Sequence, residues 1–284
     1  MRIDEKEMMA AYIRLALRED VGDGDHTTLS CIPASATDKA VLVAKEAGVI
    51  AGMEVARMVY GQMDASIVFT PLVQDGCEVK PGDRIFTVEG ASRSILTAER
   101  LSLNYIQRMS GIATYTRKLT RLVGSGTAVL LDTRKTTPNN RVFEKMAVRI
   151  GGGKNHRFGL FDMILVKDNH IDFAGGIRQA IDAVHAYLQE KDLKLAVEIE
   201  VRSFEELDEV LDRGGVDRIM LDNFTPEDIR KAVERIGGRF ETEASGGINE
   251  QTLARYAATG VDFISVGALT HHISSLDLSL KAMR

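Results

Sequence analysis

The chain has 284 residues, of which 44% are hydrophobic, so it can bury one large core or two smaller ones. Its formal net charge of −5 argues against a general nucleic-acid or membrane-surface binder, because such proteins carry a basic excess. Cys31 and Cys77 lie far apart, which excludes a disulfide framework and a thiolate zinc site. The charged N-terminus is no signal peptide, and no apolar run reaches a membrane span. These features predict a soluble cytoplasmic protein with no nucleic-acid or membrane partner.

The first part of the chain predicts a small sheet domain followed by a long helix. Apolar side chains at helical spacing predict a helix over residues 5–18, and a polar loop follows over 19–28. Residues 39–90 alternate between glycine-rich turns and short β-prone runs at 40–44, 66–71 and 84–88. This texture is typical of a mostly antiparallel sheet. Residues 94–123 then predict one helix that links two domains.

The rest of the chain alternates between strands and helices. The predicted strands cover residues 128–132, 163–167, 195–201, 218–222, 240–243 and 263–266. The predicted helices between the later strands cover residues 177–188, 204–211, 226–236 and 251–258. This alternation favours a parallel sheet closed into an α/β barrel, with an open doubly wound sheet as the alternative. No G-x-G-x-x-G follows the first strand, which disfavours a dinucleotide-binding version of that alternative.

Several of the predicted strands end in charged side chains, where parallel barrels place their functional residues. Arg134 and Lys135 follow one strand, Lys167 follows a second, and Asp222 ends a third. Glu198 and Glu200 lie two residues apart, so the pleat places both carboxylates on one face, which we expect to be the barrel interior. Buried carboxylates need a cation. A salt-bridged structural role is the alternative for any one of them.

A basic segment between residues 134 and 157 stands out in this acidic chain and indicates a polyanionic small ligand. Its cationic side chains are Arg134, Lys135, Arg141, Lys145, Arg149, Lys154 and Arg157, accompanied by His156. Arg141, Lys145 and Arg149 have helical spacing, so a solvated helix face is an equal alternative for these three. Arg134, Lys135, His156 and Arg157 flank that helix, and a ligand-binding role is favoured for them.

Two glycine-containing loops after late strands predict a phosphate site. Ser245, Gly246 and Gly247 follow one strand and precede a helix expected to begin near Asn249. Gly267, Ala268 and Leu269 follow the last strand. Backbone N–H groups at such junctions bind phosphate, although glycine also serves ordinary tight turns.

Several motifs together resemble the quinolinate phosphoribosyltransferase family over nearly the whole chain. They are Glu19-Asp-Val-Gly-Asp-Gly-Asp25, Ser110-Gly-Ile-Ala-Thr114, Asp132-Thr-Arg-Lys-Thr-Thr-Pro138, Gly151-Gly-Gly-Lys-Asn-His-Arg157, Val166-Lys-Asp-Asn-His170, Glu198-Ile-Glu200, Leu221-Asp-Asn223, Glu243-Ala-Ser-Gly-Gly247 and Ser265-Val-Gly-Ala-Leu-Thr270. The resemblance implies the type II phosphoribosyltransferase fold. An N-terminal α/β sandwich over 1–115 would be joined by the C-terminal tail 270–284, and an incomplete parallel α/β barrel would cover 116–269.

The resemblance also implies roles for individual residues. Quinolinate and phosphoribosyl pyrophosphate would be bound by Thr133, Arg134, Lys135, His156, Arg157 and Lys167. Glu200 and Asp222 would bind Mg²⁺ and act in catalysis together with Lys135 and Lys167. The 5′-phosphate would lie on Ser245, Gly246, Gly247, Gly267, Ala268 and Leu269. Arg100 would enter the active site of the neighbouring subunit in a homo-oligomer, a dimer or a hexamer. Many relatives have Gly-Leu where this chain has Asn139 and Asn140.

Three alternative functions remain open at this point. Lys167 at a strand end suits a Schiff-base aldolase, in which Lys135 and Arg157 would depress its pKa. The second is a paralogous phosphoribosyltransferase associated with molybdate-transport genes. The third is a phosphosugar sensor that has the pocket without turnover.

Overall fold

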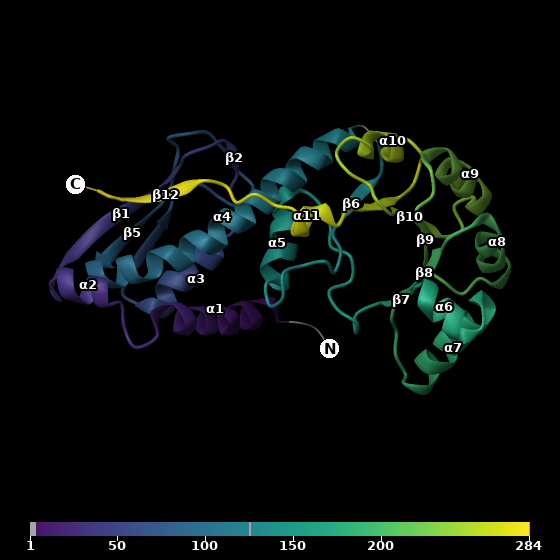
Figure 1. Cartoon of the computed structure of the whole chain (residues 1–284), viewed down its shortest axis with the longest axis horizontal. Helices are drawn as coiled ribbons and strands as arrows, with labels where there is room; N and C mark the ends of the chain where they lie inside the picture. The colour runs from purple at the N-terminus through teal and green to yellow at the C-terminus, as the bar shows by residue number, and fades with distance from the viewer. Residues whose placement is uncertain (1–3, 125, 284) are drawn as a thin grey trace. The chain divides into compact units, whose positions relative to one another are not determined.

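The computed structural model describes residues 4–124 and 126–283, which divide into two compact units (Figure 1). We call residues 118–135 and 153–268 the barrel unit. We call the other unit the sandwich unit, which comprises the chain up to 117, residues 136–152 and the chain from 269 onward. Residues 136–152 thus lie in the sandwich unit, within the range that the resemblance assigns to the barrel. Among the described residues, no helix combines the length and apolar character needed to cross a membrane.

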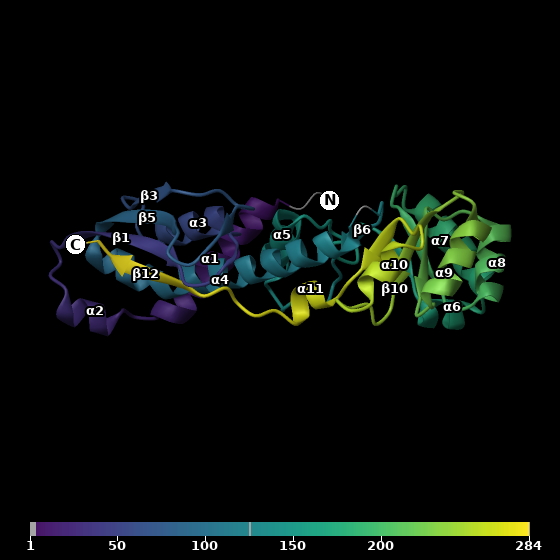
Figure 2. The same cartoon turned by 90° about the horizontal axis from the view of Figure 1, so that it is seen from above.

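The sandwich unit contains a four-stranded antiparallel sheet in the order β12-β1-β5-β3. Its strands are β1 (Thr37–Ala44), β3 (Val68–Pro71), β5 (Arg84–Ala91) and β12 (Leu278–Ala282). The short strands β2 (Gly48–Val49) and β4 (Glu78–Val79) pair separately. Figure 2 shows β12 running beside β1, so the last strand of the chain completes the edge of an N-terminal sheet. The predicted antiparallel sheet is confirmed.

The helices of this unit include one that the sequence pattern missed. They are α1 (Glu5–Val21), α2 (His26–Cys31), α3 (Met53–Met63), α4 (Ser92–Val123), α5 (Arg141–Gly151) and α11 (Ala268–His271). The end of α4 from Lys118 onward and the first residue of α11 belong to the barrel unit. The long helix α4 is confirmed. Reading 39–90 as strands and turns was wrong at α3, whose first N–H groups at Gly52 and Met53 are capped by the Asp75 carboxylate. That cap is distant in sequence, so no local start signal marks the helix.

The barrel unit has one six-stranded parallel sheet in the order β6-β11-β10-β9-β8-β7. Its strands are β6 (Val129–Leu131), β7 (Ile164–Val166), β8 (Val197–Val201), β9 (Arg218–Asp222), β10 (Glu241–Ser245) and β11 (Phe263–Ser265). Going around the sheet from β7 to β11, the strands follow chain order, β6 comes next to β11, and β7 and β6 form the two edges of the sheet. Lys154 adds a parallel bridge to Leu131 at the outer edge of β6. A doubly wound sheet would reverse its winding direction, so the incomplete barrel is confirmed.

Helices follow the barrel strands and cover the sheet (Figures 1 and 2). They are α6 (Asp168–Ala174), α7 (Ile177–Glu190), α8 (Phe204–Arg213), α9 (Pro226–Ile236) and α10 (Leu253–Ala257). α9 has strong local signals, since Thr225 accepts a hydrogen bond from the Asp228 N–H and Pro226 occupies the first turn. The predicted helix start near Asn249 was wrong, because residues 249–252 form a turn before the five-residue α10.

Candidate functional site

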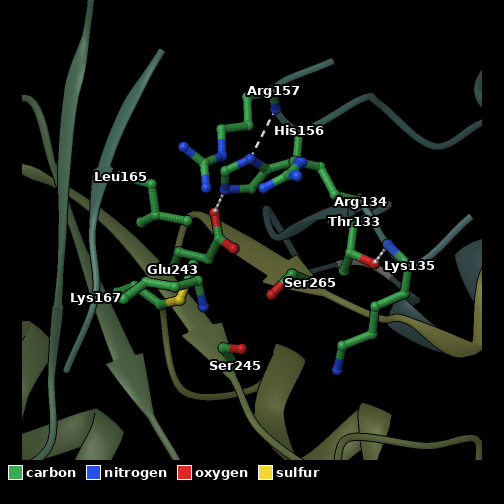
Figure 3. Close-up of a pocket in the computed structure, with 11 residues that line it drawn as sticks. Thr133, Arg134, Lys135, His156, Arg157, Leu165, Lys167, Glu243, Ser245 and Ser265 are labelled. Atoms are coloured by element: carbon green, nitrogen blue, oxygen red, sulfur yellow. Dashed lines mark hydrogen bonds and ion pairs between the residues drawn. The ribbon is translucent and has the colours of Figure 1, made fainter. Parts of the chain in front are cut away.

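A pocket of about 180 Å³ lies where the barrel strands end (Figure 3). Seven of the predicted site residues line it: Thr133, Arg134, Lys135, His156, Arg157, Lys167 and Ser245. Four further residues line it that had not been predicted as site residues: Leu165, Met220, Glu243 and Ser265. The barrel therefore gathers side chains that are more than one hundred residues apart in sequence.

The pocket is strongly cationic. Arg134 and Lys135 come from the loop after β6, Arg157 from an irregular segment, and Lys167 from the end of β7. Burial, and then the positive charge of Arg134, lower the pKa of Arg157. Like charges brought together in a partly buried site repel one another until an anion neutralises them. The pocket is therefore built to bind an anion.

Residues 153–163 form no helix or strand apart from the bridge at Lys154, yet their main chain is held firmly where it passes the pocket. Asp132 is fully buried at the end of β6. Its Oδ1 accepts from the His156 N–H at 2.9 Å, and its Oδ2 accepts from Asn155 Nδ2 at 2.6 Å. A buried carboxylate with two such donors is well satisfied. Asp132 therefore fixes the position from which His156 and Arg157 reach the pocket.

The ring of His156 is directed at protein groups on both sides. Its Nδ1 accepts from the Arg157 N–H at 2.7 Å, and its Nε2 lies 2.9 Å from Glu198 Oε2 and 3.5 Å from Glu243 Oε2. His156 thus lines the pocket with Nδ1 hydrogen-bonded, whereas Nε2 lies beside two carboxylates without a hydrogen bond to either of them.

Glu198 and Glu243 are both fully buried, as the pleat of β8 predicted for Glu198, and Glu243 lines the pocket. Burial raises the pKa of Glu198 to about 7, against the opposing charge of Arg218. Burial and the neighbouring Glu198 raise the pKa of Glu243 to about 7 as well. Arg218 Nη1 lies 3.1 Å from Glu243, and its guanidinium stacks on Phe263 at 3.9 Å.

Potential metal-ligand atoms of His156, Glu198 and Glu243 lie within 4.8 Å of one another, so the cluster has the composition of a metal site. Arg218 already supplies a positive charge there, and Arg157 and Lys167 add to the positive potential at Glu198. Arg218 therefore already balances part of the negative charge of the cluster. The salt-bridged structural alternative therefore describes Glu198 better than a metal-binding role does.

Glu200 joins the pocket through Lys167. The two side chains form an ion pair of 2.9 Å, and Glu200 is only 6% exposed. A Schiff-base aldolase needs a lysine amine that is free to attack a carbonyl, whereas the Lys167 amine is held in this ion pair. Asp222 ends β9 in register with Ser245, and its carboxylate accepts a hydrogen bond from the Asn223 side chain. Glu200 and Asp222 thus lie on neighbouring strands, and neither lines the pocket itself.

The loop after β10 owes at least one of its glycines to packing. Gly246 has φ of 98°, and a Cβ there would overlap the Asn223 side chain. The Asn223 N–H also donates to the Ser245 carbonyl at 2.9 Å, so the loops after β9 and β10 pack together. A tight turn explains Gly246 by itself. The phosphate role of residues 245–247 and 267–269 stays a prediction.

Two groups of basic residues that the sequence analysis singled out lie outside the pocket. Arg100 is an exposed residue of α4 in the sandwich unit. The basic stripe on α5 belongs to the same unit, and the solvated-face interpretation is wrong for Lys145, which is 1% exposed. Arg149 pairs with Glu5 at 2.7 Å.

Glu243 is the charged residue among the four pocket residues that the sequence analysis did not predict. It lies two positions before Ser245 on β10, so both side chains share a face of the strand. That spacing, which identified Glu198 and Glu200, would also have identified Glu243.

Comparison with known families settles the relationship of this chain. Residues 25–110 match the model described as quinolinate phosphoribosyl transferase, N-terminal domain, and residues 112–281 match its C-terminal domain. The chain belongs to the quinolinate phosphoribosyl transferase family.

Individual members of the family are similar over almost the whole chain. Quinolinate phosphoribosyltransferase [decarboxylating] 1b of Nicotiana tabacum is 44% identical over 288 residues, which cover 96% of this chain and 82% of that protein. The crystal structure of NadC from Streptococcus pyogenes matches with a TM-score of 0.92 and 40% identity over 100% of both chains. The nicotinate-nucleotide pyrophosphorylase structure from Francisella tularensis matches with a TM-score of 0.91 and 41% identity over 99% and 98% of the chains.

The departure from the family pattern at Asn139 has a simple structural reason. Asn139 has φ of 62°, in the left-handed region where glycine is favoured. Asparagine is among the side chains that tolerate this conformation best. The turn before α5 is therefore kept when asparagine replaces glycine.

Proposed function

We propose that this chain transfers the phosphoribosyl group of phosphoribosyl pyrophosphate to quinolinate, giving nicotinate mononucleotide, pyrophosphate and CO₂ for NAD synthesis. The observation that carries the proposal is the cationic pocket of a quinolinate phosphoribosyl transferase family barrel, lined by Arg134, Lys135, Arg157 and Lys167. The donor has a phosphate and a pyrophosphate, and quinolinate has two carboxylates. Only a local concentration of cations lets a protein with net charge −5 hold both.

The chemistry requires little of the protein beyond binding and electrostatics. The quinolinate nitrogen attacks C1′ of the ribose while the C1′–O bond to pyrophosphate breaks, and positive charge develops on the sugar. The C2 carboxylate then leaves as CO₂, its electron pair stays at C2 beside the cationic ring nitrogen, and a proton adds there. In this proposal Arg134, Arg157 and Lys167 hold the anionic groups, and Lys135 neutralises the departing pyrophosphate.

Mg²⁺ is the cofactor in this proposal, held by Glu200 and Asp222. Mg²⁺ in phosphate-transfer sites is commonly bound by one or two carboxylates together with substrate phosphates. Two carboxylates from the neighbouring strands β8 and β9 fit this donor set. The ion supplies charge neutralisation of the leaving pyrophosphate. We assign the 5′-phosphate to residues 245–247 and 267–269, supported by Ser245 in the pocket lining.

The proposed reaction predicts strict selection of quinolinate over nicotinate. Without the 2-carboxylate, a partly buried cation would lose its partner, which costs about 2 to 5 kcal/mol. Turnover with each acid should be measured as pyrophosphate release by the purified protein. Comparable kcat/KM for the two acids would contradict the selectivity, and absence of release with both would indicate a sensor without turnover.

The two proposed metal ligands predict a loss of rate rather than of quinolinate binding. Glu200→Gln and Asp222→Asn should each lower kcat by about 10² to 10³, because one electrostatic stabiliser of the transition state is lost. Steady-state kinetics over a Mg²⁺ series measure this effect. Glu241→Gln is the matched control, since the exposed side chain of Glu241 lies on β10 and pairs with Arg218 outside the pocket lining. Near wild-type kcat at saturating Mg²⁺ in both folded variants would refute the assignment.

We further propose that the active site is shared between two copies of the chain, with Arg100 entering the partner's pocket. The proposal rests on the family resemblance and on the exposure of Arg100 on α4. Isologous symmetry would present each Arg100 to the opposite site of a dimer.

Complementation tests the shared site directly. Homodimers of Arg100→Ala and of Lys167→Ala should both be nearly inactive. After subunit exchange, about half of the dimers are mixed and half of their sites are intact, so about a quarter of wild-type activity should return. No recovery, with exchange demonstrated by mass spectrometry, would show that Arg100 does not act in the partner's site.

We also propose a cytoplasmic location, supported by two exposed free cysteines, Cys31 and Cys77. Several relatives are named as mitochondrial or chloroplastic proteins. Cell fractionation with compartment markers would decide between these locations.

A further inference from the structure

We infer that Glu198 is a positioning residue: its carboxylate, 2.9 Å from Nε2 of His156, favours the ring proton at that nitrogen, and this orientation leaves Nδ1 as the acceptor for the Arg157 N–H. Neither carboxylate of the Glu198 and Glu243 pair is assigned to quinolinate, phosphoribosyl pyrophosphate or metal in the proposed function. Both are fully buried, and Glu243 lines the pocket.

The contacts around the His156 ring fix its tautomer. Nδ1 lies 2.7 Å from the Arg157 backbone nitrogen, whose hydrogen is always present, so Nδ1 must be the unprotonated acceptor. Nε2 then carries the ring proton and lies 2.9 Å from Glu198 Oε2. Glu243 Oε2 is farther away, at 3.5 Å. In a neutral imidazole, the partner of one nitrogen determines the role of the other.

Arg157 makes this orientation matter for function. Its guanidinium lines the pocket, but its main chain belongs to an irregular segment without strand or helix hydrogen bonds. Asp132 fixes the segment at the His156 N–H, and the His156 ring fixes it one residue later at the Arg157 N–H. A ring rotated by 180° would place a carbon at one of these contacts. Glu198 therefore acts on the anion-binding Arg157 through His156.

Arg218 offsets part of the cost of burying the Glu198 and Glu243 carboxylates. It lies on β9 in register with Glu198 and forms an ion pair of 3.1 Å with Glu243. Its Nη2 also contacts Glu241 at 2.9 Å, where the side chain of Glu241 is 54% exposed. Glu198 and Glu241 therefore flank the same arginine, but only Glu198 contacts His156. This pair supplies a matched variant and control.

The tautomer can be observed in the full-length wild-type protein. Long-range ¹H–¹⁵N spectra of protein labelled with ¹⁵N-histidine distinguish the two ring tautomers, and His156→Asn identifies the signals of His156. We expect an unprotonated Nδ1 and a protonated Nε2. A proton on Nδ1 would overturn the inference. A stoichiometric divalent metal found by elemental analysis and lost in His156→Asn would also overturn it, because Nε2 would then be a ligand.

Three variants separate the effect of the Glu198 oxygen beside Nε2 from the effect of side-chain packing. Glu198→Gln keeps an oxygen beside Nε2 and can direct its amide N–H groups toward Glu243, so the His156 tautomer and the quinolinate KM should stay close to wild type. Glu198→Met has similar length and places no oxygen beside Nε2, and its quinolinate KM should rise about tenfold while the KM for phosphoribosyl pyrophosphate is unchanged. Glu241→Gln should have the wild-type His156 tautomer and wild-type KM values for quinolinate and for phosphoribosyl pyrophosphate.

The kinetic part rests on the proposed function, whereas the tautomer does not. If wild-type protein shows no turnover of quinolinate, the proposed function fails and the spectra still test the Glu198 contact. Equal losses in Glu198→Gln and Glu198→Met would overturn the inference, as would a wild-type quinolinate KM in Glu198→Met. If Glu198→Met does not fold, an altered tautomer or a raised quinolinate KM in the folded Glu198→Gln variant remains the contradicting result.

Discussion

Three buried carboxylates hold the cationic pocket of the barrel unit in shape. Asp132 accepts hydrogen bonds from the Asn155 side chain and the His156 main chain, and Glu198 and Glu243 face the His156 ring. Buried carboxylates are costly unless donors or cations surround them, so each one forces a particular arrangement of its neighbours. Here the neighbours are the irregular segment after α5 and the Arg218 side chain. The buried acids thus constrain where the cations of the pocket lie.

This arrangement of buried acids and pocket cations lets an acidic protein bind anionic substrates. The negative charges of the barrel interior are matched locally by Arg218 and by Lys167, which pairs with Glu200. The cations at the pocket surface can then be partly buried and close together, a state that becomes favourable when an anion binds between them. Binding and charge stabilisation are also the main requirements of phosphoribosyl transfer with decarboxylation, because the ribosylated ring nitrogen itself accepts the electrons released with CO₂.

The sequence was sufficient to predict the barrel and most of the pocket lining, because strand and helix periods are local and parallel strands place their ends together. It was insufficient where residues distant in sequence determine the local structure. Helix α3 is capped by Asp75, and α5 lies in the sandwich unit although barrel residues flank it in sequence. His156 was correctly placed at the pocket, but the partners of its ring nitrogens depend on β8 and β10. Mg²⁺ binding, the phosphate loops and the sharing of Arg100 between subunits stay predictions.

The dependence of the pocket on buried acids can be tested by hydrogen exchange at two backbone amides. The His156 N–H donates to Asp132, and the Arg157 N–H donates to the His156 ring. Both amides lie in a segment without regular structure, where exchange is ordinarily fast. NMR-detected exchange in the wild-type protein should instead show both as strongly protected, with protection like that of the β8 amides. Exchange at the rate of an unstructured loop would contradict this account of how the site is held.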